Sequence, residues 1–200
     1  MAKQRLKSPR ARLFVALDLP DPVQAGIAAW GKGALSDPAL RPVAPESLHI
    51  TLAFLGYLPE REVGRLARIL SKVAGPAPSI ELGDPVARPQ RGRAGLFALP
   101  AESASAVSLQ RTLQAKLVAE RLYKPEKRPF WPHVTVARVR REKRGSRRPA
   151  PVSRPPRGLP KDLLQPFDVV RIVLYLSQIK PQGAEYTPLA QVELPADGRQ

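Results

Sequence analysis

The sequence predicts an α+β fold of two similar lobes, each an antiparallel sheet with outer helices, related by a pseudo-two-fold axis and separated by a central cleft. Two observations indicate this duplication. The pattern His-apolar-Thr-apolar occurs at residues 49–52 and again at 133–136, and the two copies contain both histidines of the chain. The apolar segment 96–100 also echoes the segment 13–17. Each His-Thr copy is expected to form a strand that lines the cleft.

A third observation is the spacing of these segments. Leu13 precedes His49 by 36 residues, and Leu96 precedes His133 by 37. Two halves of nearly equal spacing place the two His-Thr copies at equivalent positions. The chain of 200 residues is long enough to bury a substantial core. The expected organisation is a flexible basic tail, one two-lobed domain and a second tail, at residues 1–11, 12–194 and 195–200.

The first half of the chain predicts a strand, a helix, a His-Thr strand, a second helix and another strand. Asp21 is expected to cap the first helix, with Pro22 at the first helical position. A proline is tolerated there because a backbone N–H at this position has no acceptor within the helix. The second helix opens after Pro59 and is stopped by Gly75 and Pro76. These elements are expected at residues 12–19, 21 to about 31–33, 48–56, 60–74 and 80–87.

The second half predicts the same beginning and then a terminal hairpin. A basic turn leads into a strand, a serine-capped helix, a linker and the second His-Thr strand. A later segment with eight Arg or Lys and one Glu is expected to be a disordered loop, which either attracts phosphates or is a spacer. The expected boundaries are, in order, 88–93, 96–100, about 102–121, 124–132, 133–136, 140–158 for the basic loop, 160–164 for a short helix, and 167–179, 180–183 and 186–194 for the hairpin.

Composition limits the classes of function. The chain has 33 Lys and Arg against 17 Asp and Glu, a formal net charge of +16, which predicts a polyanionic partner, with RNA or DNA first, or reflects a generally basic proteome. No cysteine is present, and two histidines without an Asp/Glu cluster predict no metal and no cofactor. The apolar run 13–17 is too short for a signal peptide, and no segment predicts a membrane span. We expect a cytoplasmic monomer.

The two His-Thr copies are the candidate site. Alternate side chains of a strand share a face, so His49 and Thr51 point away from the core, about 6–7 Å apart along the strand. His133 and Thr135 have the same arrangement. One such pair is typical of an ordinary strand surface, but two copies that use every histidine favour a shared site. The core-facing residues of the first copy are expected to be Leu48, Ile50, Leu52 and Phe54.

Two opposed histidines suit general acid–base catalysis, because an imidazole with an ordinary pKa of about 6.5 exchanges protons near neutral pH. One removes a proton from a nucleophile while the other protonates a leaving oxygen. Opposed placement fits in-line displacement at phosphorus, with threonine hydroxyls and neighbouring cations around the non-bridging oxygens. The substrate must supply its own reactivity, and a strained 2′,3′-cyclic phosphate at an RNA end does so.

These residues resemble the two-histidine phosphoesterase superfamily and, within it, the RNA 2′,3′-cyclic phosphodiesterase (2′-5′ RNA ligase) family. The resemblance spans about residues 12–194, and the paired His-x-Thr motifs are distinctive of the superfamily. The basic segments 88–93 and 140–158 do not match the family pattern, which bears on substrate size and RNA affinity. The residues that carry the resemblance are RLFVAL at 12–17, LHITLAFLG at 48–56, PHVTVAR at 132–138 and LYLS at 174–177, with Gly183 and Tyr186.

The resemblance implies hydrolysis of a terminal 2′,3′-cyclic phosphate to a 2′-phosphate without a metal. It implies that His49 is the general acid for the 3′ oxygen and His133 the general base for water, although a symmetric site works in either direction. Thr51 and Thr135 are implied to bind the phosphate. Two further candidates are Arg138, which is expected to line the same site, and Trp131, which either stacks on a nucleobase or packs in the core.

Three alternatives stay open. A non-catalytic RNA-binding protein would account for the charge, but not for the shared motif of the two histidines. An enzyme of the same kind could act on a 2′-5′ oligonucleotide or a small cyclic nucleotide. The family also includes the reverse chemistry, 2′-5′ ligation of RNA ends.

Overall fold

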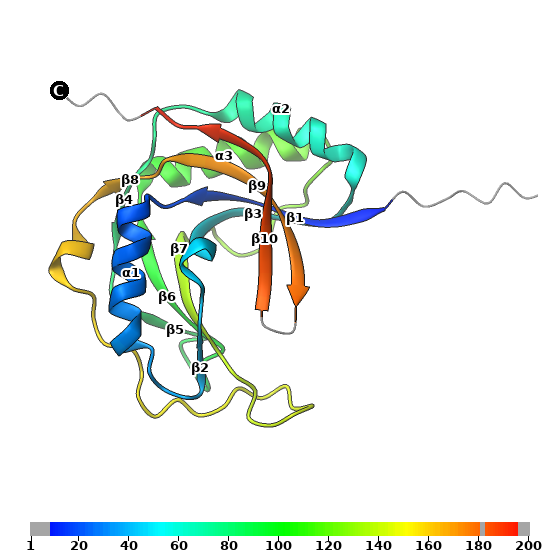
Figure 1. Ribbon diagram of the computed structural model, residues 1–200. Coiled ribbons are helices and arrows are strands. Elements are labelled where there is room, and N and C mark those ends of the chain that lie inside the picture. The colour runs from blue at the N-terminus through cyan, green and yellow to red at the C-terminus, as the bar shows by residue number, and fades with distance from the viewer. Residues whose placement is uncertain (1–8, 181–182, 196–200) are drawn as a thin grey trace, which may run out of the picture.

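The computed structural model describes residues 9–180 and 183–195, and it confirms the expected α+β class (Figure 1). Its strands form one sheet in the order β10-β9-β1-β3-β7-β6-β4-β8, with β2 added on β7 and β5 on β6. The neighbouring strands pair antiparallel. The strands are β1 (Arg10–Asp18), β2 (Leu40–Pro42), β3 (His49–Pro59), β4 (Ser79–Leu82), β5 (Val86–Arg88), β6 (Leu96–Glu102), β7 (His133–Val139), β8 (Phe167–Asp168), β9 (Arg171–Lys180) and β10 (Gly183–Glu193).

The helices lie outside this sheet. Helices α2 and α3 pack against each other and against strands β9, β10, β3 and β4 (Figure 1). Helix α1 lies at the other end of the molecule, against η1 and η3. Part of each predicted tail, residues 1–8 and 196–200, lies outside the described residues, as do two residues of the predicted hairpin turn, 181–182. The helices are α1 (Asp21–Ala34), α2 (Val63–Val73) and α3 (Ala104–Ala119), with 3₁₀ turns η1 (Pro45–Ser47), η2 (Glu60–Glu62) and η3 (Lys161–Leu164).

Two boundaries differ from the prediction. Strand β1 begins at Arg10, so the end of the expected basic tail belongs to the sheet. The N-cap of α1 is Pro20, and Asp21 is the first helical residue. A carboxylate in the first turn still stabilises the positive end of the helix dipole, which explains why Asp21 signalled the helix start without capping it. The predicted serine cap of α3 is confirmed, because Ser103 Oγ accepts a hydrogen bond from Ala106 N at 3.0 Å.

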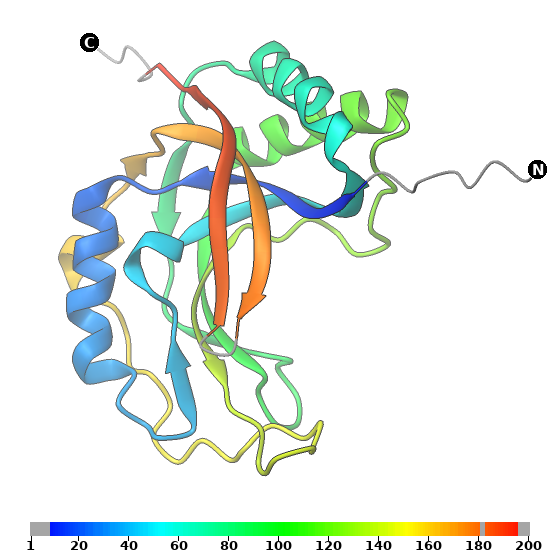
Figure 2. The ribbon, with the colours of Figure 1, turned by 45° about the vertical axis from the view of Figure 1, so that its right-hand side comes forward.

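The two halves of the sheet meet at a single residue pair. Strands β3 and β7 pair antiparallel at Ile50 and Val134. On either side, Leu17 of β1 lies opposite Ile50, and Leu99 of β6 lies opposite Val134. A pseudo-two-fold axis therefore passes between Ile50 and Val134. Figure 2 shows β10, β9 and β1 on one side of this central pair and β6 and β5 on the other.

Irregular pairing moves one predicted core residue to the surface. The register between β1 and β3 slips opposite Val15 and Ala16, so that Leu52 and Ala53 are both buried. An extra residue in a strand reverses the alternation that follows it. Phe54 consequently lies on the face of His49 and Thr51 with its side chain 52% exposed, and its predicted place in the core is wrong.

Strand β7 contains the equivalent irregularity. Its register with β6 slips opposite Phe97 and Ala98, and Val136 and Ala137 are both buried. Arg138 is therefore exposed on the same face as His133. In each half, the residue five positions after the histidine joins the histidine and the threonine on the cleft face.

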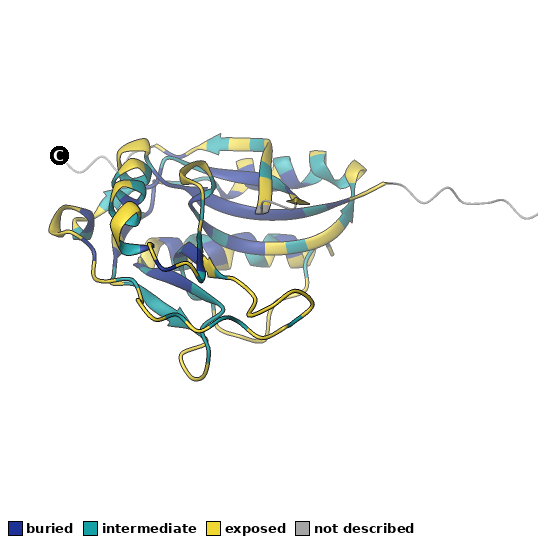
Figure 3. Cartoon of the chain, turned by 60° about the horizontal axis from the view of Figure 1, so that its bottom comes forward, coloured by how far each residue is buried: buried dark blue, intermediate teal, exposed yellow. Residues whose placement is uncertain are grey.

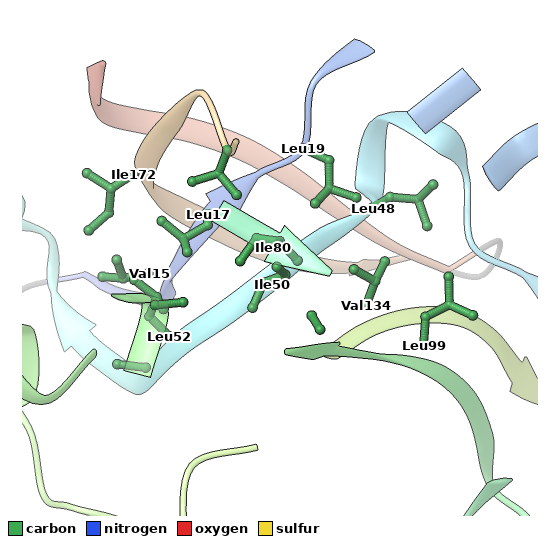
Figure 4. Close-up of a cluster of buried hydrophobic side chains, with 14 of the residues drawn as sticks. Val15, Leu17, Leu19, Leu48, Ile50, Leu52, Ile80, Leu99, Val134 and Ile172 are labelled. Carbon is green, nitrogen blue, oxygen red and sulfur yellow. The ribbon is translucent and has the colours of Figure 1, made fainter. Parts of the chain in front are cut away.

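The core lies on the opposite side of the central strands. Ile50 and Val134 are completely buried, as the alternation predicted, together with residues from both halves (Figure 4). Figure 3 shows the central strands as largely buried and the connecting loops as exposed. A continuous core behind β3 and β7 fixes the positions of the polar side chains on their other face. The labelled core residues are Val15, Leu17, Leu19, Leu48, Ile50, Leu52, Ile80, Leu99, Val134 and Ile172.

The basic segment 140–158 has a defined conformation, so its predicted disorder is wrong. Buried Asp37 accepts hydrogen bonds from the backbone N of Ser153 at 2.9 Å and of Arg154 at 2.8 Å. Near its beginning, Glu142 is paired with Arg93 at 2.9 Å. Two distant charged residues thus order a segment whose own composition is typical of disorder.

Candidate active site

The antiparallel pair at the centre of the sheet brings the two predicted motifs together. Because Ile50 lies opposite Val134, His49 lies across from Thr135, and Thr51 lies across from His133. All four side chains share the face opposite the core. The two histidines are then diagonal neighbours, and such positions have Cβ atoms about 7–8 Å apart.

Each imidazole is oriented by the same hydrogen bond. His49 Nδ1 donates to the carbonyl of Ser47 at 2.7 Å, and His133 Nδ1 donates to the carbonyl of Trp131 at 2.8 Å. Since a carbonyl only accepts, each neutral ring carries its proton on Nδ1 and leaves Nε2 free to accept. Thr51 Oγ1 lies 3.1 Å from His49 Nε2, and its hydroxyl donates to that nitrogen. Both Nε2 atoms are thus prepared for proton transfer.

Aromatic rings enclose His49. Phe14 lies 5.0 Å from its ring centroid, and Tyr186 contacts it edge-on at 5.2 Å. Tyr175 lies farther away, at 6.3 Å, and stacks on Phe14. These apolar ring faces exclude water from one side of the imidazole. The sequence analysis assigned no role in the site to Phe14 or Tyr175, because neither is near His49 in the sequence.

Trp131 contacts both a catalytic candidate and a cation. Its ring stacks on His133 with centroids 4.2 Å apart and an interplanar angle of 14°. The guanidinium of Arg88 lies over the Trp131 ring, 3.9 Å from its centroid. One face of Trp131 therefore supports the imidazole, while a cation contacts the ring as well. Trp131 is half-buried and not part of the core, and its stacking on a nucleobase stays a prediction.

The surroundings lower the pKa of both histidines. Burial lowers the pKa of His49 to about 4, although the Ser47 carbonyl and the charge of Asp18 act in the opposite direction. Burial also lowers the pKa of His133, and the positive charges of Arg88 and Arg138 add to this effect. Without a ligand, both imidazoles are therefore mostly neutral at pH 7.

Arg138 lies near both imidazoles, and Arg41 is its neighbour on the adjacent strand. Arg138 is close enough to lower the pKa of both His49 and His133, which agrees with its predicted place in the site. Strand β2 pairs with β7 so that Arg41 lies directly opposite Arg138. Arg41 was not predicted, because only the tertiary pairing of β2 brings it there. An anion between the histidines would be attracted by both guanidinium groups.

A buried carboxylate makes the two halves of the site unequal. Asp18 lies opposite His49 in the β1–β3 pairing, whereas Pro100 has the corresponding position opposite His133. Asp18 is 4% exposed and accepts hydrogen bonds from Tyr175 OH at 2.7 Å and from Arg171 Nε at 2.8 Å. Its negative charge favours the protonated form of His49, whereas among the described residues no carboxylate has this relation to His133. The pseudo-symmetry is thus broken at the position where proton transfer would occur.

In residues 9–180 and 183–195, no three or more His, Cys, Asp or Glu side chains gather in a way that would hold a metal ion. Among the helices of that same part of the chain, none has the length and apolar character needed to cross a membrane.

Known proteins are similar to this chain in both sequence and architecture. A family profile described as the 2′-5′ RNA ligase superfamily matches residues 19–174. The chain is 28% identical over 178 residues to the RNA 2′,3′-cyclic phosphodiesterase of Escherichia coli (strain K12), covering 89% of this chain and 93% of that protein. It is 30% identical over 191 residues to the RNA 2′,3′-cyclic phosphodiesterase of Thermus thermophilus, covering 92% and 90%.

Solved structures extend the similarity to the whole fold. The crystal structure of TT0787 of Thermus thermophilus superposes with a TM-score of 0.75 at 30% identity, covering 93% of this chain and 99% of that one. The crystal structure of E. coli LigT complexed with 3′-AMP gives a TM-score of 0.71 at 25% identity, covering 93% and 99%. The fold and these relatives define an enzyme of the phosphodiesterase class. The chain belongs to the 2′-5′ RNA ligase superfamily.

Proposed function

We propose that this enzyme hydrolyses the 2′,3′-cyclic phosphate at the end of an RNA and leaves a 2′-phosphate. The main support is the geometry of the two histidines, whose Nδ1 atoms make matching hydrogen bonds to backbone carbonyls and whose rings are diagonal neighbours on one face. The similar proteins of E. coli and T. thermophilus are named for this reaction. The cleft offers acid, base and cations to a single phosphate.

In the proposed reaction, the cyclic phosphate lies between the two imidazoles. His133 Nε2 removes a proton from a water molecule, whose oxygen forms a bond to phosphorus. The bond from phosphorus to the 3′ oxygen breaks in line with this attack, and protonated His49 donates its Nε2 proton to the leaving oxygen. Thr51, Thr135 and Arg138 bind the non-bridging oxygens, which carry more negative charge in the transition state.

The charges around the site support this division of roles. Asp18 lies beside His49 and stabilises an imidazolium there, whereas Arg88 and Arg138 oppose a positive charge on His133. A bound phosphate anion raises the pKa of both imidazoles, since an opposite charge favours the protonated form. Burial lowers the pKa of His49 more than Asp18 raises it, to about 4, so His49 acts as the acid in this proposal only because the bound phosphate offsets that burial.

The direct test uses a short RNA that ends in a 2′,3′-cyclic phosphate, with and without EDTA. We expect a product with its phosphate on the 2′ oxygen and a free 3′ hydroxyl, because the proposed reaction breaks the bond from phosphorus to the 3′ oxygen. Two-dimensional ³¹P–¹H NMR of the product identifies the hydroxyl that keeps the phosphate. A 3′-phosphate would reverse the assigned leaving group, and loss of turnover in EDTA that one added metal restores would contradict a mechanism based on two histidines.

The pH dependence provides a second test. The reaction needs one protonated and one neutral imidazole, so kcat/KM is highest between the two pKa values of the free enzyme and falls above the higher one. Both values are lowered, that of His49 to about 4, so we expect the alkaline limb of kcat/KM below the ordinary histidine value of 6.5. The kcat profile should lie at higher pH, because bound phosphate raises both values. An alkaline limb of kcat/KM above 6.5 would contradict the burial of these imidazoles.

The superfamily name makes 2′-5′ ligation the second candidate. In 2′-5′ ligation, a 5′ hydroxyl of RNA replaces water as the nucleophile, and the same two histidines exchange the same protons. Incubating the cyclic-phosphate RNA with a second RNA that has a 5′ hydroxyl distinguishes the two, since ligation gives a longer product. The proposal keeps the cytoplasmic location and the monomeric state that the sequence predicts.

A further inference from the structure

The pseudo-symmetry of the sheet leaves one strand edge open beside the site. Beyond Thr135, strand β2 covers the edge of β7 by pairing with residues 137–139. Strand β2 belongs to the segment that precedes His49 in the chain. The equivalent segment before His133 contains residues 124–127 and forms no strand. Within the described chain, β3 therefore has no partner strand along residues 51–54 on the side away from β1.

A pocket of about 520 Å³ occupies this open edge. Residues 51–54 of β3 form one wall, and helix α3 with residues 123–131 forms the other. Thr51 and His133 also line the pocket, so it is continuous with the proposed catalytic site. Figure 2 shows the light-green chain after α3 returning past the sheet to β7. The groove begins where the reacting phosphate would lie.

The lining of this groove combines aromatic and cationic side chains. Phe54, which the bulge in β3 turns outward, lies in the wall with Tyr123 and Phe130. The cations are Arg111 of α3 and Arg128 of the returning segment, both exposed. Glu126 is the acidic residue among the lining side chains. Aromatic rings that stack on bases, next to cations that contact the backbone, are typical of grooves for single-stranded nucleic acids.

We propose that this groove binds the nucleotides that precede the cyclic end of a single-stranded RNA, an inference that rests on the proposed function. The terminal phosphate lies between His49 and His133, a base stacks against Phe54, and Arg111 and Arg128 contact the next phosphates. Along α3, the lining residues run from Val107 to Gln114, about 10 Å, and a stacked strand rises about 3.4 Å per nucleotide. The groove therefore holds about three nucleotides.

The test compares two substrates with the double variant Arg111→Gln/Arg128→Gln. We expect wild-type kcat/KM to be about tenfold higher for an RNA trinucleotide with a 2′,3′-cyclic end than for adenosine 2′,3′-cyclic phosphate, because two more phosphates are contacted. The double variant should lose this advantage through KM, with kcat for both substrates within about twofold of wild type. Its binding should also depend less on salt, with a log–log slope smaller by about 1.4 for two phosphates of a single strand. Arg68→Gln/Lys72→Gln on α2 is the control, because it removes the same charge from residues that do not line the groove.

Direct binding separates this inference from the proposed function. A fluorescently labelled trinucleotide ending in a 2′-phosphate measures affinity by anisotropy without turnover. Weaker binding by the groove variant than by the α2 control supports the groove. If the wild-type enzyme cleaves neither substrate, that result refutes the proposed function but leaves the binding result for the groove intact. Equal losses in the two variants, or a groove variant that binds and cleaves the trinucleotide like wild type, would overturn the groove.

Discussion

Replacing either histidine with asparagine is expected to lower turnover of an RNA 2′,3′-cyclic phosphate by about 10²–10⁴-fold, since each loses one positioned acid or base. Asparagine is a more specific change than alanine at both positions, because its amide N–H can still donate to the carbonyl that accepts from Nδ1 in the wild-type enzyme. These carbonyls belong to Ser47 and Trp131. The amide cannot transfer the Nε2 proton, so the variant separates catalysis from orientation.

Single-turnover kinetics with the cyclic-phosphate RNA measure this loss, and thermal unfolding shows whether the fold is retained. Alanine at the same positions removes the hydrogen bond as well, and at His49 it leaves a space among Phe14, Tyr175 and Tyr186. If both asparagine variants, or the variant with both changes, kept wild-type turnover, the acid–base proposal would be rejected. The double variant should be little slower than the worse single one, because the two groups act in one step.

The change Arg138→Gln is expected to lower kcat by about 10²–10³-fold, the cost of losing one preorganised donor to a developing negative charge. Arg138 also lowers the pKa of both histidines. Removing its charge should therefore move both limbs of the kcat/KM profile to higher pH. A residue with a purely structural role would not produce this second effect.

Two further variants make the test specific. Arg138→Lys keeps the charge but loses the planar fork that binds two oxygens, so it should restore the pH profile and only part of kcat. Arg140→Gln is the matched control, because Arg140 is equally exposed and lies just beyond the end of β7. An Arg138→Gln enzyme with normal kcat and an unshifted profile would remove this residue from the site.

The sequence determined much of the catalytic proposal, because the relevant signals are local. The alternation in residues 48–52 placed His49 and Thr51 opposite the buried Leu48, Ile50 and Leu52, and the structure agrees. The second motif and the near-equal spacing predicted the duplicated fold. The predicted match of segment 13–17 with segment 96–100 was wrong by one residue. It pairs Ala16 with Leu99, whereas in the structure Ala16 and Ala98 have equivalent positions, each across from a threonine. Such an offset leaves no trace in the spacing.

Only the tertiary structure decided how the site differs from a symmetric one. The bulge in β3 brings Phe54 into the cleft, because one extra residue reverses the alternation on which the prediction depended. Asp18 and Arg41 reach the site through strand pairing, and the Asp37 carboxylate orders a segment more than a hundred residues away. These contacts join residues far apart along the chain, so neither periodicity nor composition records them. The chain's local patterns chose the proposed catalytic residues, and long-range pairing set their charges, their neighbours and the open groove beside them.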